Sequence, residues 1–266
     1  MMLPIESNYI PKKYYALVAK ICVTKLVYPE ENYLSNLISS VNSISDINMY
    51  LDTLVKRKHY SIFGTLYYTT ENPKYFGKYK CFKLNNNLYA ITLRHILEEN
   101  PNGFSLSTFS DIDFNLDFTK LSRHVYVVYE DEIQLSVLFV GVSRVFTHQL
   151  VRHTIFNFMQ VSNRYTTIEK EIFRYLDDLI SDNPFLNLEL IQLMQESLSI
   201  YRTLLNSGIR KEYARYVAPM GTPTVIFVNG LKEHWYKLLE TRLKDASQYE
   251  FKKLVYPIAK YLHYSN

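Results

Sequence analysis

The segment from Ser143 to Tyr165, SRVFTHQLVRHTIFNFMQVSNRY, holds the clearest pattern in this chain of 266 residues. Apolar residues recur through its first half, which predicts a helix from Ser143 to His153. Two pairs of polar residues are then four positions apart and share a face: His148 with Arg152, and Gln149 with His153. This face would present two imidazoles, an amide and a guanidinium together.

Hydrogen-bonding side chains continue beyond the predicted helix, at Gln160, Ser162, Asn163, Arg164 and Tyr165. The planar guanidinium of arginine binds phosphates and planar carbonyl edges through two parallel hydrogen bonds. Together with the hydroxyl and amide groups, this composition predicts a polyanionic small ligand such as a nucleotide. The alternative is a basic helix face that is only solvated, as most charged faces are.

The order of the residues favours the ligand. Arg152, His153 and Thr154 are followed after seven residues by Ser162, and then by Arg164 and Tyr165. This string resembles the signature of the flavin-dependent thymidylate synthases, which runs Arg-His-Arg, seven residues, Ser, and Arg-Tyr two further. The spacing is the same, but Thr154 stands where the family has arginine.

Three further stretches extend the resemblance. ARYVAP at 214–219 is similar to the family's Ala-Arg-x-x-Leu-Pro, and Arg242 with SQYE at 247–250 is similar to its Arg followed by Ala-Gln-x-Glu. A weaker match is KHYSIF at 58–63, which resembles Gly-His-x-Ser/Thr-x-x-Glu-His. Gly64 and Thr65 replace the Glu-His of that motif.

The resemblance implies an enzyme: a FAD-dependent thymidylate synthase, which is a methyltransferase of nucleotide biosynthesis. Such an enzyme makes dTMP from dUMP, with methylenetetrahydrofolate as the carbon donor and NADPH as the source of the hydride that passes through FAD. The resemblance also implies a homotetramer with its sites at subunit junctions.

Matching positions imply a role for each site residue. Arg242 and His59 would be catalytic, with Arg242 facing the uracil edge, where a guanidinium favours the anionic base. Ser162 would donate a hydrogen bond, since no general base is evident beside it. The residues implied for dUMP are Gln149, Arg152, Gln160, Ser162, Arg164, Arg215 and Arg242. Those implied for FAD are Ser61, Arg152, His153 and Thr154.

The flavin half of the resemblance departs from the family at several positions. Besides Thr154, the residues Leu231, Glu233 and Lys237 stand where the family offers polar or basic groups. Two alternatives therefore stay open. One is a catalytically impaired homologue that binds a nucleotide without turnover. The other is an unrelated nucleic-acid-binding protein whose 24 tyrosines stack on bases, although a net charge of +4 makes nucleic acid an unexpected partner.

Patterns along the rest of the chain predict an α+β fold, an antiparallel sheet flanked by helices, in a single domain over residues 1–266. The stretch 14–26 fits a strand or a helix. The predicted helices are two within 30–56, split near 43–46, and others at 187–206, 211–217, 232–243 and 245–262. The predicted strands are 61–70, a hairpin within 125–140, and 224–228. Residues 71–139 have no counterpart in the motifs, and we expect an insertion of uncertain structure there.

Composition narrows the class of protein. Apolar residues make up 47% of the chain, as in a globular protein. The two cysteines form no CxxC pair, so no metal site is expected. The first residues lack a signal-peptide pattern, and no run of about 18 apolar residues predicts a membrane span. A cytoplasmic location is therefore expected.

Overall fold

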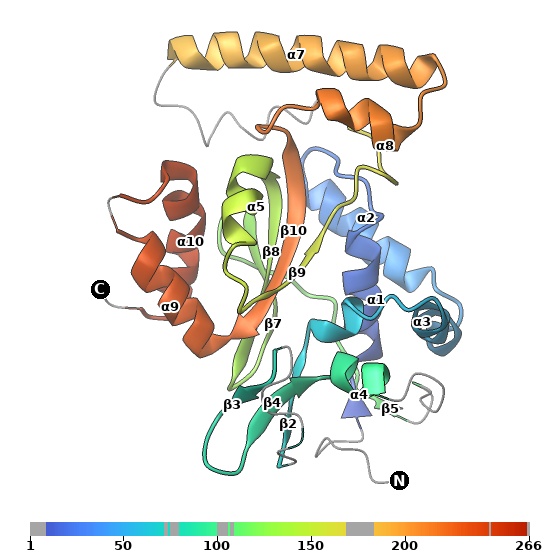
Figure 1. Ribbon diagram of the computed structural model, residues 1–266, viewed down its shortest axis with the longest axis vertical. Helices are drawn as coiled ribbons and strands as arrows, with labels where there is room; N and C mark the ends of the chain where they lie inside the picture. The colour runs from blue at the N-terminus through green and yellow to red at the C-terminus, as the bar shows by residue number, and fades with distance from the viewer. Residues whose placement is uncertain are drawn as a thin grey trace.

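A five-stranded antiparallel sheet forms the centre of the computed structural model, which describes residues 9–71, 74, 80–99, 106, 109–168, 184–244 and 246–264 (Figure 1). The strands follow the spatial order β6-β7-β8-β10-β9. Their bounds are Thr119–Lys120 for β6, Val125–Glu130 for β7, Gln134–Ser143 for β8, Asn157–Gln160 for β9 and Pro223–Leu231 for β10. The predicted hairpin is confirmed as β7 and β8, and every residue of β8 and β10 is buried. The predicted α+β class is confirmed.

Helices cover both faces of this sheet, which explains why its two inner strands are buried throughout (Figure 1). One core joins the sheet to α1 (Lys12–Ile21), α2 (Glu30–Asn42) and α3 (Ile47–Lys56). The other core joins it to α5 (Arg144–Leu150), α9 (Lys232–Arg242) and α10 (Tyr249–Tyr261). Side chains alternate between the two cores along β8, with Leu138 in the first and Val137 in the second.

A β-bulge interrupts this alternation just before α5. Val140 pairs with Val225 and Val142 pairs with Thr224, so Gly141 is an extra residue in β8. Its φ of 72° lies in the left-handed region that favours glycine. Beyond the bulge the side chains change faces, because Val140 belongs to the α1–α3 core and Val142 to the α9–α10 core. The bulge therefore turns the end of β8, and with it the start of α5, toward α9 and α10.

Smaller elements pack at the end of the sheet that carries the β7–β8 turn. A three-stranded sheet has the order β2-β4-β3, and β1 pairs with β5 in parallel. The bounds are Tyr67–Thr70 for β2, Phe82–Lys83 for β3, Tyr89–Thr92 for β4, Tyr9–Ile10 for β1, Ser110–Asp111 for β5 and Leu93–Glu99 for α4. The Gln134 amide joins β8 to β2, since it donates to the carbonyl of Tyr67 and accepts from the Tyr67 N–H, both at 2.9 Å.

The opposite end of the molecule carries the long helix α7 (Pro184–Asn206), followed by α8 (Lys211–Ala214) and the 3-10 turn η5 (Arg215–Val217) (Figure 1). Gly208, with a φ of 81°, follows the helix as the sequence predicts, and the next N–H, of Ile209, bonds to the carbonyl of Leu204 at 3.0 Å. Within the described ranges no helix has the length and apolarity needed to cross a bilayer.

Three predicted elements differ in the structure. Residues 61–70 are not one strand, because η1 (Ile62–Gly64) precedes β2 and the Thr65 hydroxyl bonds to the Ile62 carbonyl at 2.6 Å. The helix predicted to reach His153 ends at Leu150, so the expected face of four polar residues does not form as a helix surface. The predicted last helix begins at Tyr249 and continues through Pro257; Asp245, its expected cap, lies outside the described residues.

Replacing Gly141 with alanine is expected to lower the free energy of unfolding by roughly 1–2 kcal/mol, because a Cβ is disfavoured at this positive φ. Urea unfolding followed by circular dichroism measures the change. Gly64→Ala is the control, since its nearest neighbour is the flexible Arg94 side chain at 3.5 Å. Equal losses in the two variants would contradict the role given to the bulge.

Candidate functional site

The predicted residue Arg242 lies where α5, α9 and α10 meet. It is the last residue of α9, and its Nε donates to Nε2 of His153 at 2.9 Å. Its guanidinium carbon lies 4.5 Å from the ring centroid of Phe251, in the first turn of α10. A cation over an aromatic face is attracted to it. The two contacts fix the direction of the Arg242 side chain, whereas its remaining N–H groups can meet a ligand.

His153 is neutral at physiological pH. Partial burial, together with the charges of Arg242 and Arg152, lowers its pKa to about 4. Because Nε2 accepts from Arg242, the ring proton is on Nδ1 in the neutral form. His153 therefore positions a guanidinium through one nitrogen and offers a donor through the other.

A second pair of arginines lies at the other end of α5. Arg144 begins the helix, and its pKa is lowered first by burial and then by the positive charge of Arg215. Two backbone hydrogen bonds hold this end of α5 to the chain that follows η5: Arg144 N–H to Thr222 O at 3.2 Å and Val145 N–H to Met220 O at 3.1 Å. The sequence motifs did not single out Arg144.

Four guanidinium groups thus lie along α5 with no carboxylate paired to any of them in the described part of the chain: Arg144, Arg152, Arg215 and Arg242. Burial is the main cause of the lowered pKa values of Arg144 and Arg242, and the positive charges of Arg215 and Arg152, respectively, lower them further. Positive charges gathered without acidic partners are best stabilised by an anionic ligand, and arginine suits phosphate.

The remaining residues predicted for the nucleotide line neighbouring segments. Gln149 donates to Gln248 at 2.7 Å, and Gln160 donates to the hydroxyls of Thr147 at 3.2 Å and Thr224 at 3.4 Å. These bonds hold the Gln149 amide beside the start of α10 and the Gln160 amide beside α5 and β10. Each amide keeps its carbonyl oxygen as an acceptor for a ligand.

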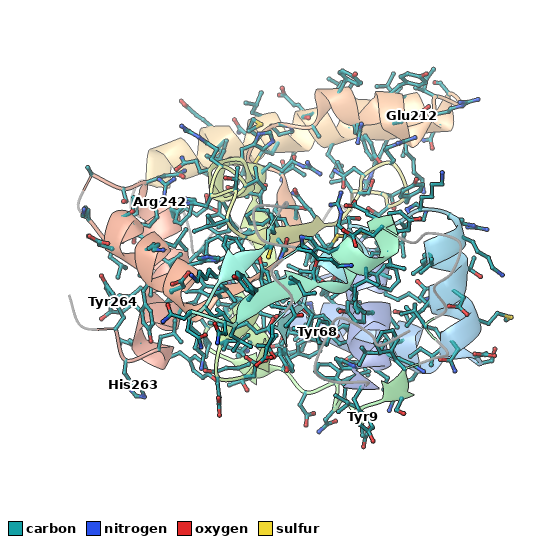
Figure 2. All side chains as sticks on the ribbon, turned by 60° about the horizontal axis from the view of Figure 1, so that its bottom comes forward. Tyr9, Tyr68, Glu212, Arg242, His263 and Tyr264 are labelled. Atoms are coloured by element: carbon teal, nitrogen blue, oxygen red, sulfur yellow. The ribbon has the colours of Figure 1, made fainter. Side chains whose placement is uncertain are left out.

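Arg164 and Ser162 lie beside α8, where the carbonyl of Glu212 also accepts from Nε of Arg215 at 3.2 Å. Arg164 pairs with Glu212 of α8 at 3.5 Å, and its backbone N–H bonds to the Ser162 hydroxyl at 3.4 Å. Figure 2 shows Glu212 near one end of the long helix α7, well apart from Arg242 beside α9 and α10. Within one chain, Arg164 is therefore not beside Arg242.

His59 and Ser61 lie on the other side of the sheet. Both side chains are exposed in the turn between α3 and η1, whose residues Ile62 and Phe63 belong to the α1–α3 core. Arg242, in contrast, packs on Phe251 of the α9–α10 core. A single chain thus separates the two residues predicted to be catalytic. A cavity of about 660 Å³ between β1, β2 and the β7–β8 turn contains none of the predicted site residues.

The flavin-side departures have different surroundings. Thr154 is exposed in the turn after α5, where its hydroxyl can meet a ligand. Leu231 is 1% exposed and packs with Tyr67 and Ala90, so this side chain cannot contact a cofactor. Glu233 is exposed and lies 3.9 Å from Lys237. Among the described residues, no three His, Cys, Asp or Glu side chains gather so that they could hold a metal ion.

The structure adds two residues that the sequence analysis quoted only as part of a motif. Gln248 binds Gln149, and Glu250 accepts from the N–H and the hydroxyl of Ser143 at 3.0 and 2.6 Å. The motif SQYE at 247–250 marked their presence, but no rule of sequence connects position 250 with position 143.

Acidification is expected to destabilise the protein partly through His153. Because its folded pKa is about 4 and its ordinary value 6.5, the unfolded chain takes up the proton first as the pH falls. This contribution to stability is complete above about pH 6.5 and is lost between 6.5 and 4. The free energy of unfolding, measured in urea at pH values on both sides of this window, should fall less in His153→Gln than in the unchanged protein.

His234, whose pKa is also lowered to about 4, remains in both proteins and cancels from the comparison. The same pH dependence in His153→Gln and in the unchanged protein would show that His153 is not held neutral.

Comparison with known proteins gives relatives of one kind. The chain is 33% identical over 122 residues to the flavin-dependent thymidylate synthase of Pyrococcus furiosus, a match that covers 44% of this chain and 49% of that protein. It is 29% identical over 133 residues to the probable flavin-dependent thymidylate synthase of Paramecium bursaria Chlorella virus 1, covering 45% and 62%. The chain thus spans about half the length of the curated relatives it matches.

A solved structure with partial likeness is the flavin-dependent thymidylate synthase of Helicobacter pylori complexed with FAD and dUMP. The identity is 20%, the TM-score is 0.39, and the match covers 48% of this chain and 65% of that one.

The sequence profile of the family described as thymidylate synthase complementing protein matches residues 116–263, which is more than half of the chain. The match takes in the β7–β8 hairpin, part of the segment 71–139 in which we expected an insertion. It also contains all four arginines along α5, whereas His59 and Ser61 lie outside it. The resemblance indicated by the motifs is confirmed, and the chain belongs to the thymidylate synthase complementing protein family.

Proposed function

We propose that this protein is a FAD-dependent thymidylate synthase, which makes dTMP from dUMP with methylenetetrahydrofolate as the carbon donor and NADPH as the hydride source. The observation that carries the proposal is the row of four arginines along α5 without acidic partners. Membership of the family supports it, as do relatives that are named for this activity. The cytoplasmic location remains a prediction.

The row of arginines has a length that suits a nucleotide. Helix α5 has seven residues and is therefore roughly 10 Å long. Arg144 and Arg215 would neutralise a phosphate at one end, and Arg152 and Arg242 would face the base at the other. Gln149, between the two ends, would accept a hydrogen bond from the nucleotide.

Arg242 would act on the uracil. Phe251 and His153 hold its guanidinium in one direction, which lowers the entropy that the side chain loses when a ligand binds. A fixed cation at the edge of the pyrimidine stabilises negative charge on the ring, and so makes C5 a better nucleophile.

FAD, when bound, would carry the hydride from NADPH to the carbon that becomes the methyl group. Its diphosphate would be held by Arg152, the exposed hydroxyl of Thr154 and the Nδ1–H of His153, with the exposed hydroxyl of Ser61 supplied by a second copy of the chain. The buried Leu231 does not fit a cofactor contact. The flavin would therefore be held by fewer groups than the family motif offers.

A second copy of the chain would complete the site, as in a homotetramer with sites at subunit junctions. His59 and Ser61 lie across the sheet from Arg242, and Arg164 is apart from it as well. One side of α7 suits contact with that copy: Leu193 and Ile200 are seven residues apart, share this side of the helix, and are 58% and 53% exposed. Exposed apolar residues that lie together on a surface mark sites of protein contact, and we assign this side of α7 to such a contact.

The function predicts a yellow protein. Purified chain, as isolated or after incubation with FAD, should show flavin absorbance, and with methylenetetrahydrofolate supplied it should oxidise NADPH only when dUMP is present. A colourless protein that cannot take up FAD would overturn the proposal. Binding of dUMP by that colourless protein would indicate the impaired homologue, and salt-sensitive binding of single-stranded DNA without dUMP binding would indicate a nucleic-acid-binding protein.

In the same assay, Arg242→Ala should abolish turnover and weaken dUMP binding by about tenfold or more, the loss expected for a hydrogen bond to a charged group. Arg202→Ala is the matched control, because this exposed arginine of α7 removes the same charge away from α5. Equal dUMP affinities in the two variants would remove Arg242 from the site.

An oligomer is expected in solution, and sedimentation should give a mass above the 31.5 kDa of one chain. The double variant Leu193→Asp with Ile200→Asp should lower that mass, since two carboxylates would be buried without partners. Met49→Asp is the control, at a 64% exposed residue of α3. A monomeric unchanged protein, or a double variant of unchanged mass, would contradict the assignment of this face.

A further inference from the structure

The start of α10 is bound to the start of α5 through a buried carboxylate. Glu250 is 9% exposed, and its two oxygens accept from the backbone N–H of Ser143 at 3.0 Å and from its hydroxyl at 2.6 Å. The same hydroxyl oxygen accepts from the N–H of Phe146 at 3.0 Å and so caps α5. One side chain of α10 therefore holds the first turn of α5.

The residues on either side of Glu250, at the start of α10, extend this contact to the other end of α5. Gln248 accepts from Gln149 at 2.7 Å, and the ring of Phe251 lies under Arg242. Within four positions of sequence, 248 to 251, the chain thus contacts the beginning of α5, its penultimate residue and the guanidinium proposed to face the base.

Glu250 makes no ion pair, although it lies in the same helix junction as the arginines. Both of its oxygens bond to Ser143, and no arginine or lysine contacts it within the described part of the chain. A buried carboxylate that paired with a guanidinium would compete with an anionic ligand for it. In this arrangement the carboxylate orients the helix and leaves the positive charges to the ligand.

We infer that Glu250, assisted by Gln248, is a positioning residue of the nucleotide site, which holds α5 so that Gln149, Arg152 and His153 face the ligand. The inference rests on the proposed function, because it names the nucleotide as that ligand. Residues 248–251 would then contribute to the affinity for the nucleotide, and not only to the packing of the helices.

The test measures dUMP affinity by calorimetry on the FAD-treated full chain. Glu250→Ala removes both bonds to Ser143 and should weaken dUMP binding by about tenfold or more. Glu250→Gln keeps one acceptor for the Ser143 N–H and an amide that can donate to its hydroxyl, so its affinity should stay within about threefold of the unchanged protein.

Asp46→Ala is the matched control. Asp46 caps α3 by accepting from the Met49 N–H at 2.9 Å, on the other face of the sheet. Its loss should lower stability as the loss of a helix cap does, yet leave dUMP affinity unchanged. The inference is overturned if Glu250→Ala is folded and binds dUMP normally, or if Asp46→Ala weakens binding as much as Glu250→Ala does.

A second readout needs no ligand. Amide hydrogen exchange over residues 146–150 should be faster in Glu250→Ala by about tenfold or more, with residues 50–56 unchanged, and Asp46→Ala should show the reverse. If the unchanged protein fails to bind dUMP, the proposed function is wrong. Exchange then decides alone whether Glu250 holds α5, and unchanged exchange overturns the inference.

Should Glu250→Ala not fold, Gln248→Ala takes its place, because it removes only the bond to Gln149. A loss of dUMP affinity of about threefold or more supports the inference, and unchanged affinity overturns it.

Discussion

The antiparallel pairing of β8 with β10 is the contact on which the rest of the structure depends. The two strands are paired from Ser143 and Pro223 at one end to Gln134 and Leu231 at the other, and both are buried on both faces. A sheet of this kind needs a layer of helices on each side. The α1–α3 layer meets that need on one face, and α5, α9 and α10 meet it on the other. Each strand also leads directly into a helix of the candidate site, β8 into α5 and β10 into α9.

The site is therefore a property of strand ends and helix ends, not of a single loop. Residues far apart in the chain become neighbours because the helices that follow two adjacent strands, α5 after β8 and α9 after β10, pack on the same face of the sheet. The arrangement brings positive side chains together and places no acidic side chain of the described residues against them. Neutral groups hold the site's side chains in position instead: His153 and Phe251 contact Arg242, and Gln248 contacts Gln149. The arginines of such a site therefore keep their hydrogen bonds and charge for an anionic ligand, because few of them are used in ion pairs within the protein.

Many of the helices and strands could be predicted from the sequence, because their local hydrophobic patterns match the elements that form in the structure. The helical periodicity of 30–56 and of 187–206 and the alternation of the β7–β8 hairpin are local signals, and the structure confirms them. The sequence patterns did not predict features that depend on a contact with a residue far away in the chain. The carbonyl of Thr65, in the turn before β2, accepts from the buried hydroxyl of Tyr14, and position 65 alone does not reveal that bond. The role of Arg144 depends on the remote Arg215 in the same way, and an arginine in the first turn of a helix belongs to no motif. The roles of the predicted site residues stay predictions.

Because of the bulge at Gly141, the face of the sheet on which α5 packs depends on whether the number of residues in β8 is odd or even. Side chains on a strand point alternately to the two faces, so one extra residue is equivalent to half a turn of whatever follows. Without it, Val142 would join the face of Val140 and α5 would leave the sheet among the N-terminal helices, opposite α9 and α10. Any one-residue insertion or deletion between 134 and 143 would therefore be far more disruptive than its size suggests. A two-residue change, which restores the alternation, would keep the helix on the correct side and alter only how far along the sheet it starts.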